Sequence, residues 1–184
     1  MTYRITLLIS FLVVVAVACV ACSAVSSKRP TATGPANAEL GQVGTAVGNT
    51  APAFNLTKMD GSDVALADLR GKPSVLIFWT AWCPVCKEEA PHFNALAEQY
   101  EPRGVQVLGI NIQDSIPRTQ GGIKDFGIRY AVARDPDASV ARRYRVAGTP
   151  TIIFLDRQGV VHYFGNELPA DYSARLDALL AKGA

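Results

Sequence analysis

The sequence has few of the residues that several specialised protein classes need. It has four cysteines in 184 residues, too few for the dense disulfides that hold small secreted domains together. It also has no basic run and no internal repeat. The charges before position 49 are Arg4, Lys28, Arg29 and Glu39, so the remaining chain carries 15 basic and 15 acidic residues. A neutral body gains nothing from the counterion release that drives nucleic-acid binding, so nucleic acid is excluded as a partner.

Histidine is scarce as well, with only His92 and His162. A structural zinc site needs four ligands, and Cys83 and Cys86 have no second cysteine pair in the body to complete such a site. What the chain does have is 49% hydrophobic and 18% charged residues, a normal mixture for one globular domain with its own core.

Residues 1–22 are expected to be an export signal, either a signal peptide, a lipoprotein signal or a membrane anchor. Met1–Arg4 is short and positively charged, Ile5–Ala18 is uninterrupted and apolar, and small residues follow. Residues 23–48 are rich in Ser, Thr, Ala, Gly and Pro without apolar periodicity, which predicts a flexible tether. Residues 49–184 are then the folded domain, expected to be extracytoplasmic, on the periplasmic side of the membrane.

The chemistry of the anchor is open at this stage. Val15–Ala18 followed by Cys19 resembles a bacterial lipobox, in which the cysteine is lipidated, and Cys22 is a second, less regular candidate. An uncleaved helical anchor is the competing interpretation, since the apolar run is near the lower limit for spanning a bilayer. Simple cleavage and release is the third.

The body alternates between strand and helix patterns, which predicts an α/β sandwich with a mixed sheet and helices on both faces. After an initial hairpin that includes 64–66, strands are expected at 75–79, 105–110, 151–155 and 160–164. Helices are expected from Cys83 to Gly104, at 115–127, at 138–144 with Asp137 as the N-cap, and from 169 or 170 onward.

The motif Trp82-Cys83-Pro84-Val85-Cys86 lies where a buried strand turns into a helix. At this spacing, two sulfurs in the first helical turn can close a small, reversible disulfide. Cys83 would face unpaired N–H groups and the positive end of the helix dipole, which favour its thiolate. Pro84 suits the first helical position because its missing N–H would have no partner there. We expect Cys86 to be more buried, so that Cys83 attacks and Cys86 resolves.

Two longer stretches resemble thioredoxin-like proteins of the TlpA/ResA/CcmG group. They are Phe78–Pro91 and Tyr144–Thr151, and upstream Gly48–Phe54 and Leu69–Pro73 look like that group's first segment. The resemblance covers about residues 48–182. It implies a thioredoxin-like three-layer sandwich and a membrane-tethered, extracytoplasmic thiol–disulfide oxidoreductase, often a reductant in cytochrome c maturation.

The resemblance also implies roles for individual residues. Cys83 is the nucleophile and Cys86 the resolving thiol. Pro150 matches the family's cis-proline, whose loop with Thr149 lies beside the disulfide and pairs with substrate backbone. Glu89 matches the group's buried acidic residue, which we expect to assist proton movement at Cys86.

The surroundings of the motif complete the expected site. Trp82 is expected to shape the exposed rim, with Pro84 and Val85 also bordering the substrate, whereas Trp79 belongs to the core. The cycle needs no organic cofactor or metal, because the thiols carry the electrons. Pro84 and Val85 offer no polar or basic group to stabilise a thiolate heavily, which favours a reductant.

The expected partners follow from this chemistry. They are protein disulfide substrates, such as apocytochrome c or other exported thiol proteins, and a membrane reductant that restores the dithiol. Two alternatives stay open. A thiol peroxidase would need proline where Leu76 stands, four residues before Thr80. A copper-binding protein or metallochaperone would use Cys83, Cys86 and His162.

Overall fold

A computed structural model describes residues 42–182 of the chain. The expected export signal, most of the expected tether, and the lipidation candidates Cys19 and Cys22 lie outside the described residues. Within the described part, none of the helices combines the length and apolar character needed to cross a membrane.

A seven-stranded mixed sheet forms the centre of the domain, in the order β2-β1-β5-β4-β3-β6-β7. The parallel pairs are β3–β4 and β4–β5, and the remaining neighbours are antiparallel. The strands are β1 (Asn55–Lys58), β2 (Asp63–Ala65), β3 (Ser74–Trp79), β4 (Gln106–Ile112), β5 (Ala131–Asp135), β6 (Thr151–Leu155) and β7 (Val161–Gly165).

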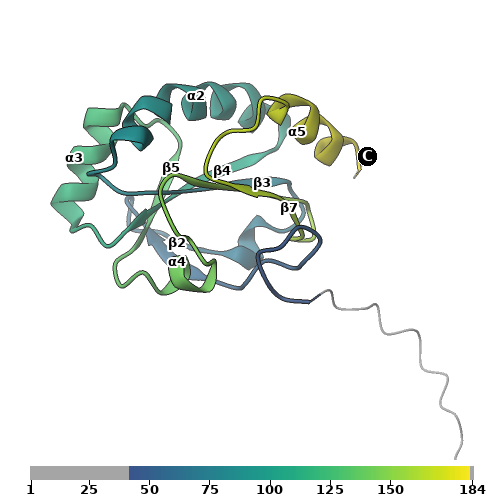
Figure 1. Ribbon diagram of the computed structural model, residues 1–184, viewed down its shortest axis with the longest axis horizontal. Coiled ribbons are helices and arrows are strands. Elements are labelled where there is room, and N and C mark those ends of the chain that lie inside the picture. Colours follow the sequence, from purple (N-terminus) through teal and green to yellow (C-terminus); the bar gives the residue numbers. More distant parts are fainter. Residues whose placement is uncertain (1–41, 183–184) are drawn as a thin grey trace, which may run out of the picture. The chain divides into compact units, whose positions relative to one another are not determined.

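Helices cover both faces of this sheet, as Figure 1 shows, with α2, α3 and α5 on one side and α4 on the other. The helices are α2 (Pro84–Tyr100), α3 (Ile116–Phe126), α4 (Ser139–Arg143) and α5 (Tyr172–Ala181), with short 3-10 turns at η1 (Leu66–Leu69) and η2 (Glu101–Arg103). The predicted α/β sandwich with helices on both faces is therefore confirmed.

The hydrophobic core has one part on each face of the sheet, and strand β3 contributes to both. Every one of its six residues is buried. Val75, Ile77 and Trp79 face α2, α3 and α5, whereas Leu76 and Phe78 face the β1–β2 hairpin and the α4 region. An uninterrupted apolar strand is thus required here, since alternation would leave polar groups inside one layer.

Two local expectations were wrong. Strand β5 was not predicted, because Ala131–Asp135 is short and ends on Arg134 and Asp135, residues with weak strand preference. It forms because β4 and β1 pair with it on either side.

The N-terminus of α4 is capped differently from the expectation that Asp137 is its N-cap. The buried Asp135 carboxylate accepts hydrogen bonds from the N–H groups of Val140 (3.2 Å) and Ala141 (2.7 Å), while the Asp137 carboxylate accepts one only from the N–H of Ser139.

The folded region begins earlier than the expected boundary at residue 49. Residues 42–50 form a loop that hydrogen-bonds to itself and to the start of β7: Gly44 N–H donates to Thr50, and Gly48 N–H donates to Val161. The last seven residues of the expected tether are therefore part of the folded region.

Candidate active site

The candidate site lies at the carboxyl end of β3, where the chain leaves the sheet and enters α2. The turn places Cys83 at the N-cap of α2, with extended backbone angles, and Pro84 at the first helical residue. Both positions agree with the sequence-based expectation.

Cys83 and Cys86 are joined by a disulfide, with their Cα atoms 5.2 Å apart. The two residues are almost equally buried, at 5% and 3% exposed. The expected difference in exposure between them is therefore slight in this oxidised form, so burial does not distinguish attacker from resolver.

Hydrogen bonding does distinguish the two sulfurs. The Cys86 N–H donates to Cys83 Sγ over 3.1 Å, in the manner of a helix N-cap. When the disulfide is reduced, the same donor and the helix terminus favour the thiolate at Cys83. Of the two sulfurs, Cys83 Sγ is thus the one that accepts a backbone hydrogen bond at the helix terminus.

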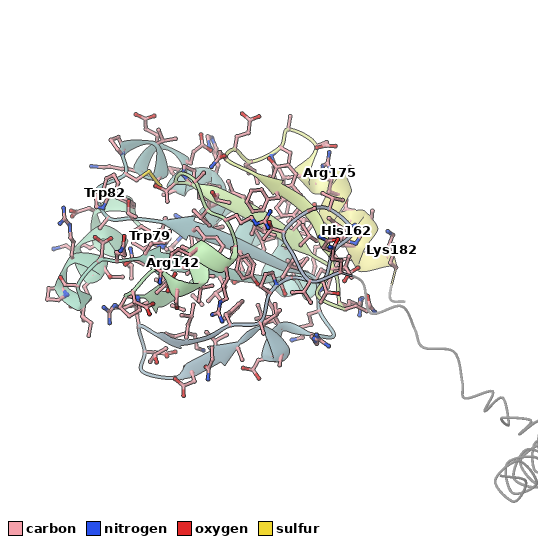
Figure 2. The ribbon with its side chains drawn as sticks, turned by 60° about the horizontal axis from the view of Figure 1, so that its bottom comes forward. Trp79, Trp82, Arg142, His162, Arg175 and Lys182 are labelled. Atoms are coloured by element: carbon pink, nitrogen blue, oxygen red, sulfur yellow. A yellow bond between two sulfur atoms is a disulfide. The ribbon has the colours of Figure 1, made fainter. Side chains whose placement is uncertain are left out.

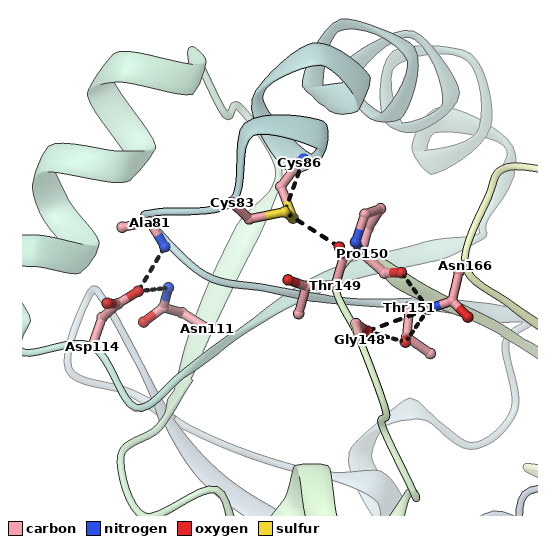
Figure 3. The surroundings of a disulfide bond; sticks show 10 residues. All are labelled: Ala81, Cys83, Cys86, Asn111, Asp114, Gly148, Thr149, Pro150, Thr151 and Asn166. Carbon is pink, nitrogen blue, oxygen red and sulfur yellow. Dashed lines mark hydrogen bonds between the residues drawn. A yellow bond between two sulfur atoms is a disulfide. The ribbon is translucent and has the colours of Figure 1, made fainter.

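A second loop reaches the same sulfur from the other side, as Figure 3 shows. The Thr149–Pro150 peptide bond is cis, as predicted, and the Thr149 carbonyl oxygen lies 3.3 Å from Cys83 Sγ. Pro150 is buried and Thr149 is half-buried. This loop is therefore positioned to contact a polypeptide that approaches Cys83.

The rim of the site is apolar and exposed. Trp82 is 64% exposed and Val85 is 50% exposed, and the two lie on either side of Cys83 and Pro84 in the sequence. Beside the disulfide lies an open cavity of about 310 Å³, whose lining includes the oppositely charged Lys87 and Asp125. Trp79, by contrast, is a core residue with 1% exposure.

Glu89 is not the buried carboxylate that the resemblance implies. Its side chain is 32% exposed, and its carboxylate lies 3.2 Å from the Nδ1 of the exposed His92. A glutamate three residues before a histidine on one helix lies on the same face, so the two side chains can pair.

The buried carboxylate near the site is Asp114, which sequence reasoning missed. Its Oδ2 accepts the Ala81 N–H over 2.7 Å and the Asn111 amide over 2.9 Å, and Arg118 lies 3.5 Å from Oδ1. Asn111 in turn accepts the Thr119 hydroxyl. This network fixes the backbone two residues before Cys83. The available signal was position, because polar residues directly after a buried parallel strand gather at the sheet edge that carries the motif.

His162, the histidine of the copper-binding alternative, does not lie near the cysteine pair. His162 lies on β7 with its Nε2 2.9 Å from Asp156, by the turn that links β6 to β7. Figure 2 shows it at the opposite end of the domain from the disulfide, which lies near Trp82. Across residues 42–182, no three His, Cys, Asp or Glu side chains come together as a metal site would require.

Known proteins share this arrangement. The family model described as AhpC/TSA matches residues 47–164. A thiol-disulfide oxidoreductase ResA from Geobacillus kaustophilus is 35% identical over 116 residues, which cover 63% of this chain and 67% of the relative.

Two solved structures extend the comparison to the fold. A thioredoxin-family thiol:disulfide interchange protein from Chlorobium tepidum superposes with a TM-score of 0.63 at 26% identity, covering 73% of this chain and 98% of that one. A secreted Mycobacterium tuberculosis disulfide oxidoreductase homologous to DsbE gives a TM-score of 0.58 at 28% identity, covering 70% and 95%.

The matched region contains the cysteine pair, the cis-proline loop and six of the seven strands completely. The sheet with helices on both faces is a thioredoxin fold, and the chemistry at Cys83 and Cys86 is thiol–disulfide exchange. The chain belongs to the AhpC/TSA family and is a thiol–disulfide oxidoreductase of the ResA/DsbE type.

Proposed function

We propose that this enzyme reduces disulfides in exported proteins, from a position tethered to the outside of the cytoplasmic membrane. The observation that carries the proposal is the placement of Cys83 Sγ between the Cys86 N–H and the Thr149 carbonyl of the cis-proline loop. The Cys86 N–H favours the thiolate form of Cys83, and the Thr149 carbonyl belongs to a loop that can pair with a substrate backbone.

The reaction proceeds in two exchanges. The Cys83 thiolate attacks one sulfur of the substrate disulfide, forming a mixed disulfide and releasing the other substrate sulfur as a thiolate. Cys86 then loses its proton and attacks Cys83 Sγ, which closes the enzyme disulfide and releases the second substrate sulfur. Two electrons pass to the substrate, and a dithiol donor in the membrane must return two to the enzyme.

The surroundings of Cys83 favour the reducing direction. A strongly oxidising pair needs a heavily stabilised thiolate, and the residues between the cysteines, Pro84 and Val85, provide no side-chain donor. Lys87 lines the neighbouring cavity, but Asp125 lines it too and offsets the positive charge. Stabilisation of the Cys83 thiolate then comes mainly from the helix terminus.

The reduction potential tests this direction. Equilibration of the purified protein with dithiothreitol or glutathione buffers should give a potential more negative than about −230 mV, in the range of thioredoxin and the more reducing glutaredoxins. A value nearer the −120 to −180 mV typical of DsbA and protein disulfide isomerase would make the protein an oxidant or isomerase.

Trapping tests the roles of the cysteines. Cys86→Ala should attack substrates without completing the cycle, so mixed disulfides accumulate that dithiothreitol dissolves, whereas Cys83→Ala should trap little. The trapped proteins would identify the substrates, with apocytochrome c among those expected. Equal trapping by both variants would mean that the roles assigned to the two cysteines are wrong.

Glu89 remains a proposed proton acceptor for Cys86, one helical turn away on the same face. Glu89→Gln keeps the size of the side chain and removes its charge, so it should slow release of the mixed disulfide and change its pH dependence. A variant that releases substrate with the wild-type pH profile would leave Glu89 only its contact with His92.

The proposed tether is tested at the protein's own N-terminus. Mass spectrometry of the N-terminal peptide should find a lipid on Cys19 or Cys22, or an intact apolar segment beginning at Met1. Recovery of all the native protein in a soluble fraction would contradict anchoring.

The peroxidase alternative is not favoured by the geometry. In the described part of the chain, the Thr80 hydroxyl is buried and has no hydrogen-bond partner, so it makes no hydrogen bond to the Cys83 sulfur. The preceding position that such a site fills with proline is Leu76, in the middle of strand β3.

A further inference from the structure

An asparagine outside the cysteine motif holds the cis-proline loop in place. Asn166 directly follows β7, and its Nδ2 lies 2.8 Å from the Pro150 carbonyl, 3.0 Å from the Thr151 hydroxyl oxygen and 3.3 Å from the Gly148 carbonyl. Figure 3 shows the side chain reaching across to these three residues from the far side of the loop.

The partners fix which end of the amide faces the loop. Two of the three are carbonyl oxygens, which only accept, and the Thr151 hydroxyl uses its own hydrogen to bind the Gly148 carbonyl at 2.6 Å. Only the nitrogen of Asn166 can therefore face them, since the amide oxygen would have no hydrogen to share.

These contacts bracket Thr149. Asn166 binds the Gly148 carbonyl and the Pro150 carbonyl, so it holds the peptide planes that flank the cis Thr149–Pro150 peptide on either side. The Thr149 carbonyl is the group that lies against Cys83 Sγ. The contacts of Asn166 are with the loop, and none of its hydrogen bonds is with either cysteine.

We propose that Asn166 is a positioning residue for substrate recognition: it sets the cis-proline loop so that a polypeptide can pair with it, and it leaves the thiol chemistry unchanged. The inference rests on the proposed reduction of protein disulfides. It predicts that loss of the Asn166 amide weakens reaction with peptide disulfides and spares reaction with small ones.

The test mixes the full-length protein, reduced beforehand, with an excess of each of two disulfide substrates and follows a single turnover, so that KM and kcat denote the half-saturating substrate concentration and the maximal rate constant of that turnover. The first is a synthetic ten-residue peptide closed by a Cys-x-x-Cys disulfide, and the second is 5,5′-dithiobis(2-nitrobenzoate), which is too small to pair along the loop. Asn166→Ala should raise KM for the peptide about three- to tenfold, the range of one or two lost neutral hydrogen bonds, with kcat almost unchanged. Its rate with the small disulfide should equal that of wild type.

Two further variants sharpen the comparison. Asn166→Asp keeps the shape but places a carboxylate against two carbonyl oxygens, so it should raise KM at least as much as Asn166→Ala. Glu167→Gln is the matched control on the next, equally exposed residue, and should match wild type with both substrates.

A double-variant cycle tests the network itself. Thr151→Val removes one partner of Asn166, so combining it with Asn166→Ala should raise KM by less than the product of the two separate effects. Independent effects would mean that Asn166 does not act through this loop.

The outcomes separate the inference from the proposed function. If wild type reduces the peptide and Asn166→Ala does so equally well, the positioning role is wrong while the proposed function stands. If Asn166→Ala slows both substrates equally, the residue has a general structural role and the inference fails. If wild type reduces the small disulfide but not the peptide, the proposed function is wrong, and the recognition role of Asn166, which rests on it, is wrong as well.

Discussion

Two adjacent glycines in α3 offer a matched test of how tightly the active-site loop is packed. A Cβ added to Gly122 would lie 2.8 Å from the Ala81 Cβ, 2.9 Å from the Trp79 ring and 3.2 Å from the Ala81 Cα, whereas one added to Gly121 would meet nothing within 4 Å. Both residues lie inside the same helix. Gly121→Ala therefore controls for helix preference, and Gly122→Ala adds only the clash.

The magnitudes follow from these contacts. Alanine in place of glycine inside a helix stabilises by about 0.5–1 kcal/mol, and both variants gain this. Overpacking a filled site costs about 1–3 kcal/mol, and only Gly122→Ala incurs it. Gly121→Ala should therefore exceed wild type in unfolding free energy by about 0.5–1 kcal/mol, and Gly122→Ala should lie about 1–3 kcal/mol below Gly121→Ala.

Urea denaturation of the oxidised proteins measures both differences. A second readout is chemical: because Ala81 lies two residues before Cys83, displacement of its backbone should slow reaction of the reduced Gly122→Ala protein with 5,5′-dithiobis(2-nitrobenzoate), while Gly121→Ala reacts normally. If Gly122→Ala is as stable as Gly121→Ala and equally reactive, the loop is not packed against α3 as described.

Two further predictions concern the other face of the sheet. Asp135→Ala should cost about 2 kcal/mol of unfolding free energy in urea, because it leaves the first N–H groups of α4 unpaired, whereas Asp137→Ala at an exposed position should cost about half as much or less. Burial raises the pKa of Tyr144, whose hydroxyl donates to the Pro52 carbonyl over 2.7 Å. Since its folded-state pKa is raised above the unfolded value of about 10, its contribution to stability is complete below pH 10 and falls as the pH rises further. Tyr144→Phe should show a shallower alkaline loss of stability, with Tyr130 and Tyr163, whose pKa values burial also raises, contributing to the slope that remains; a slope unchanged from wild type would contradict this.

The sequence was most informative where one local pattern determines one structure. The apolar run at 75–79, the cysteine pair after it and the Thr149–Pro150 step each carry their own signal, and each lies where it was expected. Strand β5 could not be recognised in the same way, because its formation depends on pairing with β1 and β4 and not on its own composition.

The supporting residues of the site were missed for a related reason. Asp114 binds Ala81 across 33 residues of sequence, and Asn166 binds Pro150 across 16. Neither belongs to a motif, and an aspartate or asparagine in a loop usually binds its own neighbouring backbone. Glu89 also depends on its neighbours: it lies one helical turn from Cys86, as its spacing predicts, but its side chain is 32% exposed and contacts His92.

The loop at residues 42–50 is bound at the end of the sheet that lies away from the reactive sulfur. Ala51 and Val161 tie it to the β6–β7 turn, and antiparallel pairing sets that turn beside Ser74, at the amino end of β3. Cys83 lies beyond the other end of this six-residue strand, which spans about 20 Å. The contacts of the 42–50 loop with the β6–β7 turn thus lie toward one end of β3, and the disulfide lies beyond the other end. A protein that approaches the disulfide end of the domain therefore reaches Cys83 without passing the 42–50 loop.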